Sequence, residues 1–208
     1  MLSKTLFYCL IIVLGIFLSG TLTAFMICLL YNQPFINPSF TKQQIFDRFL
    51  DILKNSIFIL CIATLFTAFI FKKMLPNSAH SWRQTIFTVI IFSIAIEFFY
   101  YIYHRIVHKI GYELIHEKHH RNEVVYPFDT FDFTFVDSLS LVVSIGLPLL
   151  LIPVTVLEQC IILYIYVTSS YLSHSQLFYD HHHKHHYLKH CNYCIFLPIF
   201  DILFGTYK

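Results

Sequence analysis

Residues 5–31 contain no charged side chain, which constrains the fold more than any other feature of the sequence. A helix needs about 20 apolar residues to cross the hydrocarbon core of a bilayer. A cleaved signal peptide also begins with a basic residue such as Lys4, but its apolar region covers only about 7–15 residues. Hydrophobic residues form 57% of the 208-residue chain and charged residues 12%, about half the charged share of a soluble domain. We therefore predict a membrane-spanning helix, and the net charge of +2 does not indicate a nucleic-acid partner.

Further apolar runs predict that the whole chain is an all-α, integral membrane helical bundle. Residues 55–71 and 84–103 are two more spans, and residues 138–172 form a hairpin because Pro148 and Pro153 interrupt the run. Residues 41–54 alternate charged and apolar positions at helical spacing, which predicts a separate amphipathic helix lying on the membrane surface. Residues 1–83 would then hold the N-terminal spans and this interfacial helix, and residues 84–208 a second unit.

Histidines are the chemically informative residues of the second unit. Two runs share one spacing, in which a histidine is followed by two residues and then a histidine pair, which predicts three imidazoles on a single helical turn in each run. A further pair lies one helical turn apart. Imidazole is the commonest protein ligand of zinc, iron and copper, so these residues are enough for two metal ions. The candidate ligands are His104, His108, His116, His119, His120, His174, His182, His185 and His186. Cys191 and Cys194 also have metal-ligand spacing, and a separate zinc site there is a weaker alternative.

Glu97 is a lone carboxylate inside the apolar run that precedes His104. Seven residues separate the two, so they lie almost on one line along a helix. Carboxylates often accept hydrogen bonds from metal-bound histidines, and we predict this role for Glu97. The alternative is a glutamate near the end of the span that extends to water.

The distribution of basic residues predicts that the histidines face the cytosol. With the spans above, the histidine side holds ten of the fourteen lysines and arginines, and the opposite side holds Lys4, Lys72, Lys73 and Arg83. The ten are Lys42, Arg48, Lys54, Arg105, Lys109, Lys118, Arg121, Lys184, Lys189 and Lys208. Four of the six cysteines lie in apolar runs and no disulfide framework is apparent, which agrees with a reducing compartment.

Several motifs over residues 84–208 resemble the fatty acid hydroxylase/sterol desaturase superfamily of membrane-bound di-iron oxygenases. They are Glu97-x3-Tyr101-x2-His104-Arg105-x2-His108, His116-x2-His119-His120-Arg121-Asn122, His182-x2-His185-His186, Asn192-Tyr193 and Phe200-Asp201-x2-Phe204-Gly205-Thr206. Residues 112–122 have local similarity to cholesterol 25-hydroxylase, and the chain also resembles sterol C4-methyl oxidase types. The resemblance implies that the histidine boxes bind the metals, that His174 is an isolated ligand, and that Asn192 and Asp201 support the site. It also implies a catalytic domain over residues 84–208.

The function that the resemblance implies is hydroxylation or desaturation of a sterol or fatty acyl lipid with dioxygen and external electrons. Its cofactor would be a dinuclear iron centre, with zinc able to substitute. The chain has no glycine-rich nucleotide motif, so a reductase or small haem carrier would supply electrons. In a eukaryote the protein would lie in the endoplasmic reticulum.

Three alternatives stay open at the level of sequence. A membrane zinc hydrolase would use Glu117 as its base, whereas the second triplet has Lys184 at that position. A metal transporter would place its ligands in the middle of the bilayer. A catalytically degenerate member is the third, because the segment between His174 and His182 is shorter than the resemblance leads one to expect.

Overall fold

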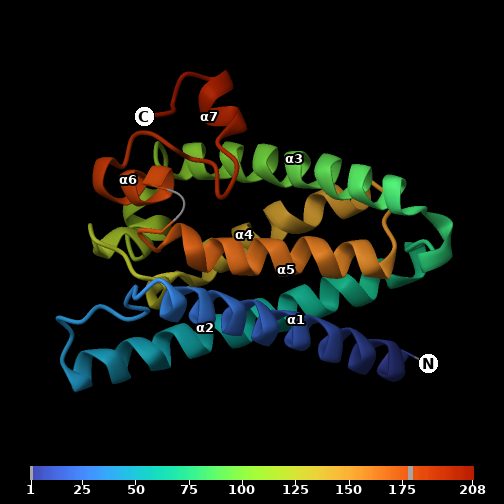
Figure 1. Ribbon diagram of the computed structural model, residues 1–208, viewed down its shortest axis with the longest axis horizontal. Helices are drawn as coiled ribbons and strands as arrows, with labels where there is room; N and C mark the ends of the chain where they lie inside the picture. The colour runs from blue at the N-terminus through green and yellow to red at the C-terminus, as the bar shows by residue number, and fades with distance from the viewer. Residues whose placement is uncertain (1, 178–179) are drawn as a thin grey trace.

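The computed structural model describes residues 2–177 and 180–208, which form a bundle of long helices with short helices at one end (Figure 1). The described residues contain one isolated β-bridge, between Leu75 and Thr155, and no strand. The α-helices are α1 (Leu2–Leu30), α2 (Lys42–Ile70), α3 (Trp82–Val107), α4 (Phe135–Gly146), α5 (Val156–Ser173), α6 (Asp180–Leu188) and α7 (Ile199–Leu203).

Four of these helices, α1, α2, α3 and α5, are long and apolar enough to cross a membrane. The shortest is α5 with 18 residues, about 27 Å at 1.5 Å per residue, close to the thickness of a hydrocarbon core. Their outward faces carry many exposed large apolar side chains, such as Leu18 and Leu22 on α1 and Phe87 on α3. The predicted all-α membrane bundle is confirmed.

Helix α2 differs from the sequence prediction because it is continuous from Lys42 to Ile70. A capping box between Thr41 and Gln44 begins it, and no proline or glycine interrupts it. The prediction of a separate interfacial helix at residues 41–54 is therefore wrong. Two charges of this half contact other parts of the protein: Arg48 donates to Asp129 at 2.7 Å and to Asn122 at 3.0 Å, and Asp51 pairs with Lys118 at 3.6 Å.

The apolar region 138–172 forms the predicted hairpin. Helix α4 has 12 residues, about 18 Å, and is too short to span a bilayer. It ends at a short 3-10 helix (Leu147–Leu150) containing Pro148, and α5 begins after the N-cap residue Thr155. At this turn the backbone N–H of Leu75 donates to the carbonyl of Val154.

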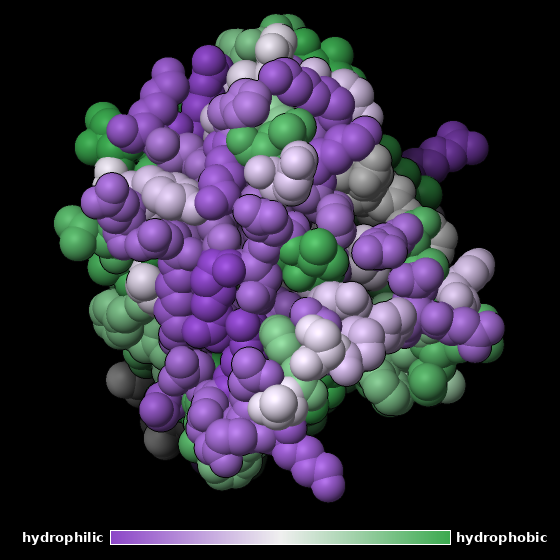
Figure 2. All heavy atoms as spheres, turned by 90° about the vertical axis from the view of Figure 1, so that its left-hand side faces the viewer, coloured by the Kyte–Doolittle hydropathy of each residue, from purple (hydrophilic) through white to green (hydrophobic). Residues whose placement is uncertain are grey.

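Helices α1 to α5 alternate in direction, with the short α4 returning between α3 and α5, so α1, α3 and α5 all end where α2 begins (Figure 1). The C-terminal ends of α1, α3 and α5, together with α6 and the loops that connect them, form one end of the bundle. This end is largely hydrophilic, whereas the adjoining sides carry hydrophobic side chains (Figure 2). Both sets of histidines therefore lie at the same end. The division of the chain at residue 84 stays a prediction, since α1 packs along α5 and α2 along α4.

Candidate metal centre

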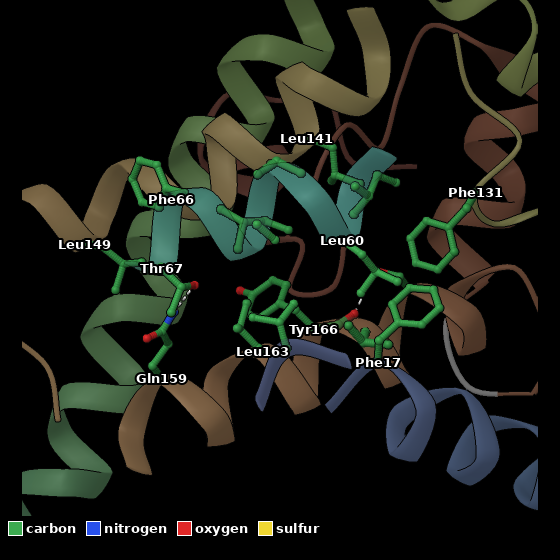
Figure 3. Close-up of a pocket in the computed structure, with 18 residues that line it drawn as sticks. Phe17, Leu60, Phe66, Thr67, Phe131, Leu141, Leu149, Gln159, Leu163 and Tyr166 are labelled. Atoms are coloured by element: carbon green, nitrogen blue, oxygen red, sulfur yellow. Dashed lines mark hydrogen bonds between the residues drawn. The ribbon is translucent and has the colours of Figure 1, made fainter. Parts of the chain in front are cut away.

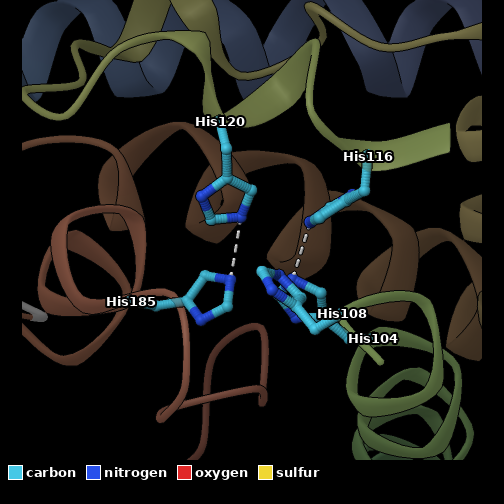
Figure 4. A group of neighbouring side chains, drawn as sticks. All are labelled: His104, His108, His116, His120 and His185. Carbon is cyan, nitrogen blue, oxygen red and sulfur yellow. Dashed lines mark hydrogen bonds between the residues drawn. The ribbon is translucent and has the colours of Figure 1, made fainter. Parts of the chain in front are cut away.

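Nine histidine side chains form two adjoining groups at the hydrophilic end, and in each group the ring nitrogens lie within 4.8 Å of one another. The five-histidine group is His104, His108, His116, His120 and His185 (Figure 4). The four-histidine group is His119, His174, His182 and His186. The imidazoles of His120 and His186 stack with ring centroids 4.4 Å apart, so the two groups are in contact. All nine residues singled out from spacing are present, including His174, and neither group contains a cysteine among the described residues.

The ends of helices bring these residues together. His104 lies in the last turn of α3, His108 caps that helix, and His174 caps α5. Gly111 then reverses the chain at φ +93°, a conformation that residues with a Cβ rarely adopt. His116 ends a π-helical turn (Tyr112–His116).

The spacing predicts that the first histidine triplet lies on one regular α-helical turn, and this prediction is wrong. His119 and His120 follow the π-helical turn on a short 3-10 helix (His119–Arg121). The second triplet lies on α6 as predicted.

The closest pair of imidazoles has the geometry expected around a cation. The Nδ1 of His104 lies 2.8 Å from the carbonyl oxygen of Tyr193, and the Nδ1 of His116 lies 2.8 Å from a carboxylate oxygen of Asp137. Both acceptors require a proton on Nδ1, so each neutral ring has a lone pair on Nε2. These two Nε2 atoms face each other at 2.9 Å. Two lone pairs at this distance repel, and a metal ion between the rings removes the repulsion.

Metal–nitrogen geometry agrees with this separation. Ligand nitrogens about 2.1 Å from a metal and at right angles to each other are about 3.0 Å apart. The Nε2 atoms of His185 and His120 lie 3.0 Å apart, and those of His174 and His119 lie 3.3 Å apart. The residues present therefore fit metal ions in both groups.

Several buried ring nitrogens of the cluster have no hydrogen-bond partner among the residues that the structure describes. They are Nε2 of His108, Nδ1 of His119 and His120, and both nitrogens of His182 and His186. Unpartnered buried polar atoms are rare in proteins and indicate a missing ligand when they gather in one place.

Burial also keeps several of the rings beyond the spans neutral, which is the form that binds metal. Desolvation, with smaller contributions from His116 and Lys189, lowers the pKa of His108 to about 3. Desolvation lowers the pKa of His174 to about 4. Burial likewise lowers the pKa values of His182 and His186 well below the ordinary value.

Residues 191–197 form a loop that orients two of the histidines through backbone carbonyls. The carbonyl of Tyr193 accepts from His104, and the carbonyl of Cys191 accepts from Nδ1 of His185 at 2.6 Å. Asp201 holds this loop by accepting from the backbone N–H groups of Tyr193 at 2.7 Å and Cys194 at 2.8 Å.

Asn192 fixes the same loop from the other side. Its backbone is left-handed at φ 56°, and its side-chain amide donates to the carbonyls of His181 and Lys208. Its side-chain oxygen accepts from the backbone N–H of Lys208 at 2.8 Å. Asn192 and Asp201 thus act on the histidines through the backbone.

Glu97 does not accept a hydrogen bond from His104, so that prediction is wrong. Both nitrogens of His104 have other partners, and the Glu97 carboxylate accepts from the backbone N–H groups of residues 195–197 at 3.0–3.1 Å. It also accepts from the hydroxyl of Tyr166 at 3.2 Å. Glu97 therefore holds the same loop as Asn192 and Asp201.

The carboxylate that does contact a candidate ligand is Asp137, which the sequence reasoning missed. It lies in the first turn of α4, is 2% exposed, and accepts from His116 at 2.8 Å and from the hydroxyl of Tyr103. Its signal in the sequence is an acid at the edge of the apolar run 138–172, whereas Glu97 lies inside its run.

Comparison with known proteins agrees with this geometry. Residues 89–206, more than half of the chain, match the family described as fatty acid hydroxylase. The matched region contains all nine histidines and Asp137. Comparisons with curated proteins and with solved structures found no match. The family match, the helical membrane bundle and the histidine cluster agree, and the chain belongs to the fatty acid hydroxylase family.

Proposed function

We propose that this protein is a membrane-bound oxidoreductase that hydroxylates or desaturates a sterol or fatty acyl lipid. The observation that supports it best is the pair of adjoining histidine groups at the end of an apolar bundle, with lone pairs of His104 and His116 facing each other at 2.9 Å. Family membership supports a lipid hydroxylase type of function.

The cofactor in this proposal is a dinuclear iron centre with one ion in each group. The nine histidines are its ligands, and Asp137 together with residues 191–197 orients them. Iron would supply the reduction of dioxygen and the attack on an unactivated C–H bond. Hydroxylation inserts one oxygen atom into the C–H bond and reduces the other to water, which requires two electrons and two protons from outside the chain.

The chain's own residues would hold the rings in place and exclude water. His104, His116, His174 and His185 each donate through Nδ1 to a fixed acceptor, which leaves Nε2 available for metal. Eight of the nine histidines are fully buried, so bulk water has little access.

The remaining parts of the proposal concern the orientation of the protein in the membrane, its compartment and its electron donor. Basic residues concentrate toward the histidine end, which supports a cytosol-facing site and, in a eukaryote, the endoplasmic reticulum. A separate reductase or small haem carrier would supply the electrons.

The test compares wild-type protein with the His120→Ala variant in cells supplied with ¹⁸O₂. Elemental analysis of the purified wild type should find about two metal ions per chain, as in other two-metal sites. Because zinc binds such sites more tightly than iron, the purified protein is also reconstituted with ferrous iron under anaerobic conditions and then assayed with lipid, a reductase and ¹⁸O₂.

A lipid carrying one ¹⁸O atom, or a new double bond, should appear only with the wild type. Two bound metals without any oxidised lipid, when a reductase is supplied, would refute the oxidoreductase assignment. Hydrolysis of a lipid ester by the zinc form would support the zinc hydrolase instead.

A further inference from the structure

An apolar cavity lies in the bundle among α1, α2, α4 and α5 (Figure 3). Its walls are aliphatic and aromatic over most of their extent, with Phe17, Leu60 and Leu163 as examples. No lysine, arginine, histidine, aspartate or glutamate is among the residues that line it. The cavity therefore suits an uncharged apolar molecule.

One end of this cavity adjoins a small pocket beside the four-histidine group. Phe131, Leu141 and Ser170 line the cavity, and the same three residues line a small adjoining pocket. His119, His174 and His182 form part of the wall of that pocket. A chain lying in the cavity would therefore approach the four-histidine group.

The other end carries a polar pair, Thr67 on α2 and Gln159 on α5 (Figure 3). The side-chain amide of Gln159 donates to the hydroxyl oxygen of Thr67 at 3.0 Å, and the residues are only 6% and 5% exposed. Gln159 precedes His174 by fifteen residues of α5, which places it about 22 Å from that histidine along the helix.

This pair keeps free hydrogen-bond donors, whereas the hydroxyl protons of the other polar side chains of the wall already have acceptors. The hydroxyl of Ser170 donates to the carbonyl of Tyr166, and the hydroxyl of Tyr166 donates to Ser93 and Glu97. The Gln159 amide has a second N–H and two acceptor lone pairs, and one amide N–H meets the oxygen of Thr67. One small hydroxyl group fits this capacity, because it both donates and accepts.

We propose that the cavity binds a lipid with an apolar body and one hydroxyl, which lies at Thr67 and Gln159 while the far end of the body reaches the four-histidine group. This rests on the proposed function and adds the substrate class and its orientation. Oxidation then falls on a carbon about 20 Å from the hydroxyl. A carboxylate or phosphate lipid is disfavoured at the same end, because its charge would be buried without a basic partner among the lining residues.

The experiment measures binding to protein reconstituted in nanodiscs, independently of turnover. Octadecanol and octadecane form one pair of probes, cholesterol and cholestane form the second, and stearate tests a charged end group. The long-chain alcohol and the sterol distinguish the two sources of such a hydroxyl. In at least one pair the alcohol should bind the wild type about tenfold more tightly than the hydrocarbon, and octadecanol should bind more tightly than stearate.

Two variants remove the polar pair with little change of volume, Gln159→Leu and Thr67→Val. Each should reduce the preference for the alcohol to less than about twofold while metal content stays unchanged. Thr168→Val on α5 is the matched control, since Thr168 does not line the cavity, and it should keep the full preference. Because Thr67→Val is nearly isosteric, it tests the idea even where Gln159→Leu fails to fold.

Equal binding of alcohol and hydrocarbon by the wild type in both pairs would overturn the inference. Retention of the preference in Thr67→Val and Gln159→Leu would overturn it too, as would tighter binding of stearate than of octadecanol. Oxidation close to the hydroxyl would contradict the orientation. A preference that the variants abolish, without any oxidised product, would support this binding site and refute the proposed function.

Discussion

Replacing Asp137 by asparagine should weaken metal binding by the five-histidine group and leave the four-histidine group unaffected. Asparagine keeps the size of the side chain and still accepts from Nδ1 of His116, so the fold should persist. The substitution removes the negative charge of the carboxylate, one oxygen of which lies 2.8 Å from Nδ1 of His116. A hydrogen bond to a charged group contributes about 1.5–3 kcal/mol and a neutral one about 0.5–1.5 kcal/mol. The difference of about 1–1.5 kcal/mol corresponds to roughly tenfold in affinity.

The second hydrogen bond of the carboxylate, from the hydroxyl of Tyr103, adds to this effect because it fixes the carboxylate's orientation. We therefore expect the affinity to fall by about 10- to 100-fold, the range usual for partners of metal-bound histidines. The assay is a chelator titration with metal counted per chain. Carried out in a His119→Ala background it reports on the five-histidine group, and in a His185→Ala background on the four-histidine group.

Asp47→Asn is the matched control, because Asp47 is an exposed aspartate of α2 that accepts only from Gln43 in the same helix. The metal affinity of the Asp47→Asn variant should equal that of the parent protein in both backgrounds. An affinity of the Asp137→Asn variant that changes less than twofold, or that falls equally in both backgrounds, would refute the reasoning.

Three further predictions concern the rest of the site. His119→Ala and His185→Ala should each reduce the metal content from about two ions per chain to about one, measured by elemental analysis, and the double variant should bind none; full content in both single variants would contradict two separate groups. Asp201→Ala should lower thermal stability and metal affinity together, because two buried backbone N–H groups lose their acceptor at about 1–3 kcal/mol each, and Asp201→Asn should cost less. Gly111→Ala should destabilise the protein by about 1–2 kcal/mol because of its φ of +93°, whereas Gly15→Ala in the open middle of α1 should be neutral or stabilising in the same thermal assay.

The membrane bundle and the set of nine histidines could be predicted from sequence because both depend on local patterns. Apolar runs have the length of a bilayer, and repeated histidine spacings have few explanations other than metal. How the histidines divide into two groups could not be predicted in the same way. His119 and His120 are neighbours yet belong to different groups, as do His185 and His186. Adjacent residues on a helix point about 100° apart, so each pair serves two sites once α3, α5 and α6 have packed together.

The prediction for Glu97 failed for a measurable reason. Seven residues give the right direction on a helix but also about 10.5 Å of rise, too far for His104 to donate a hydrogen bond to the carboxylate of Glu97. Asp137 lies on another helix, 21 residues after His116, and reaches it only through the packing of α4 on α3. The prediction of an interfacial helix at residues 41–54 failed for a related reason. A helix whose charged side chains contact charged loops alternates charged and apolar residues in the same way as a helix that contacts lipid headgroups.

The two groups differ in what surrounds them, and this difference suits the proposed reaction. A polar cleft reaches the five-histidine group, with Glu117, Lys118 and Arg121 in its wall beside His120. The apolar cavity adjoins the small pocket beside the four-histidine group, and Phe131 lies in the wall of both. Oxidation of a lipid needs electrons and protons from the aqueous side and a substrate from the bilayer. Because the two groups adjoin at the boundary between the hydrophilic end and the apolar bundle, each supply would have its own approach, and the lipid would not have to leave the membrane.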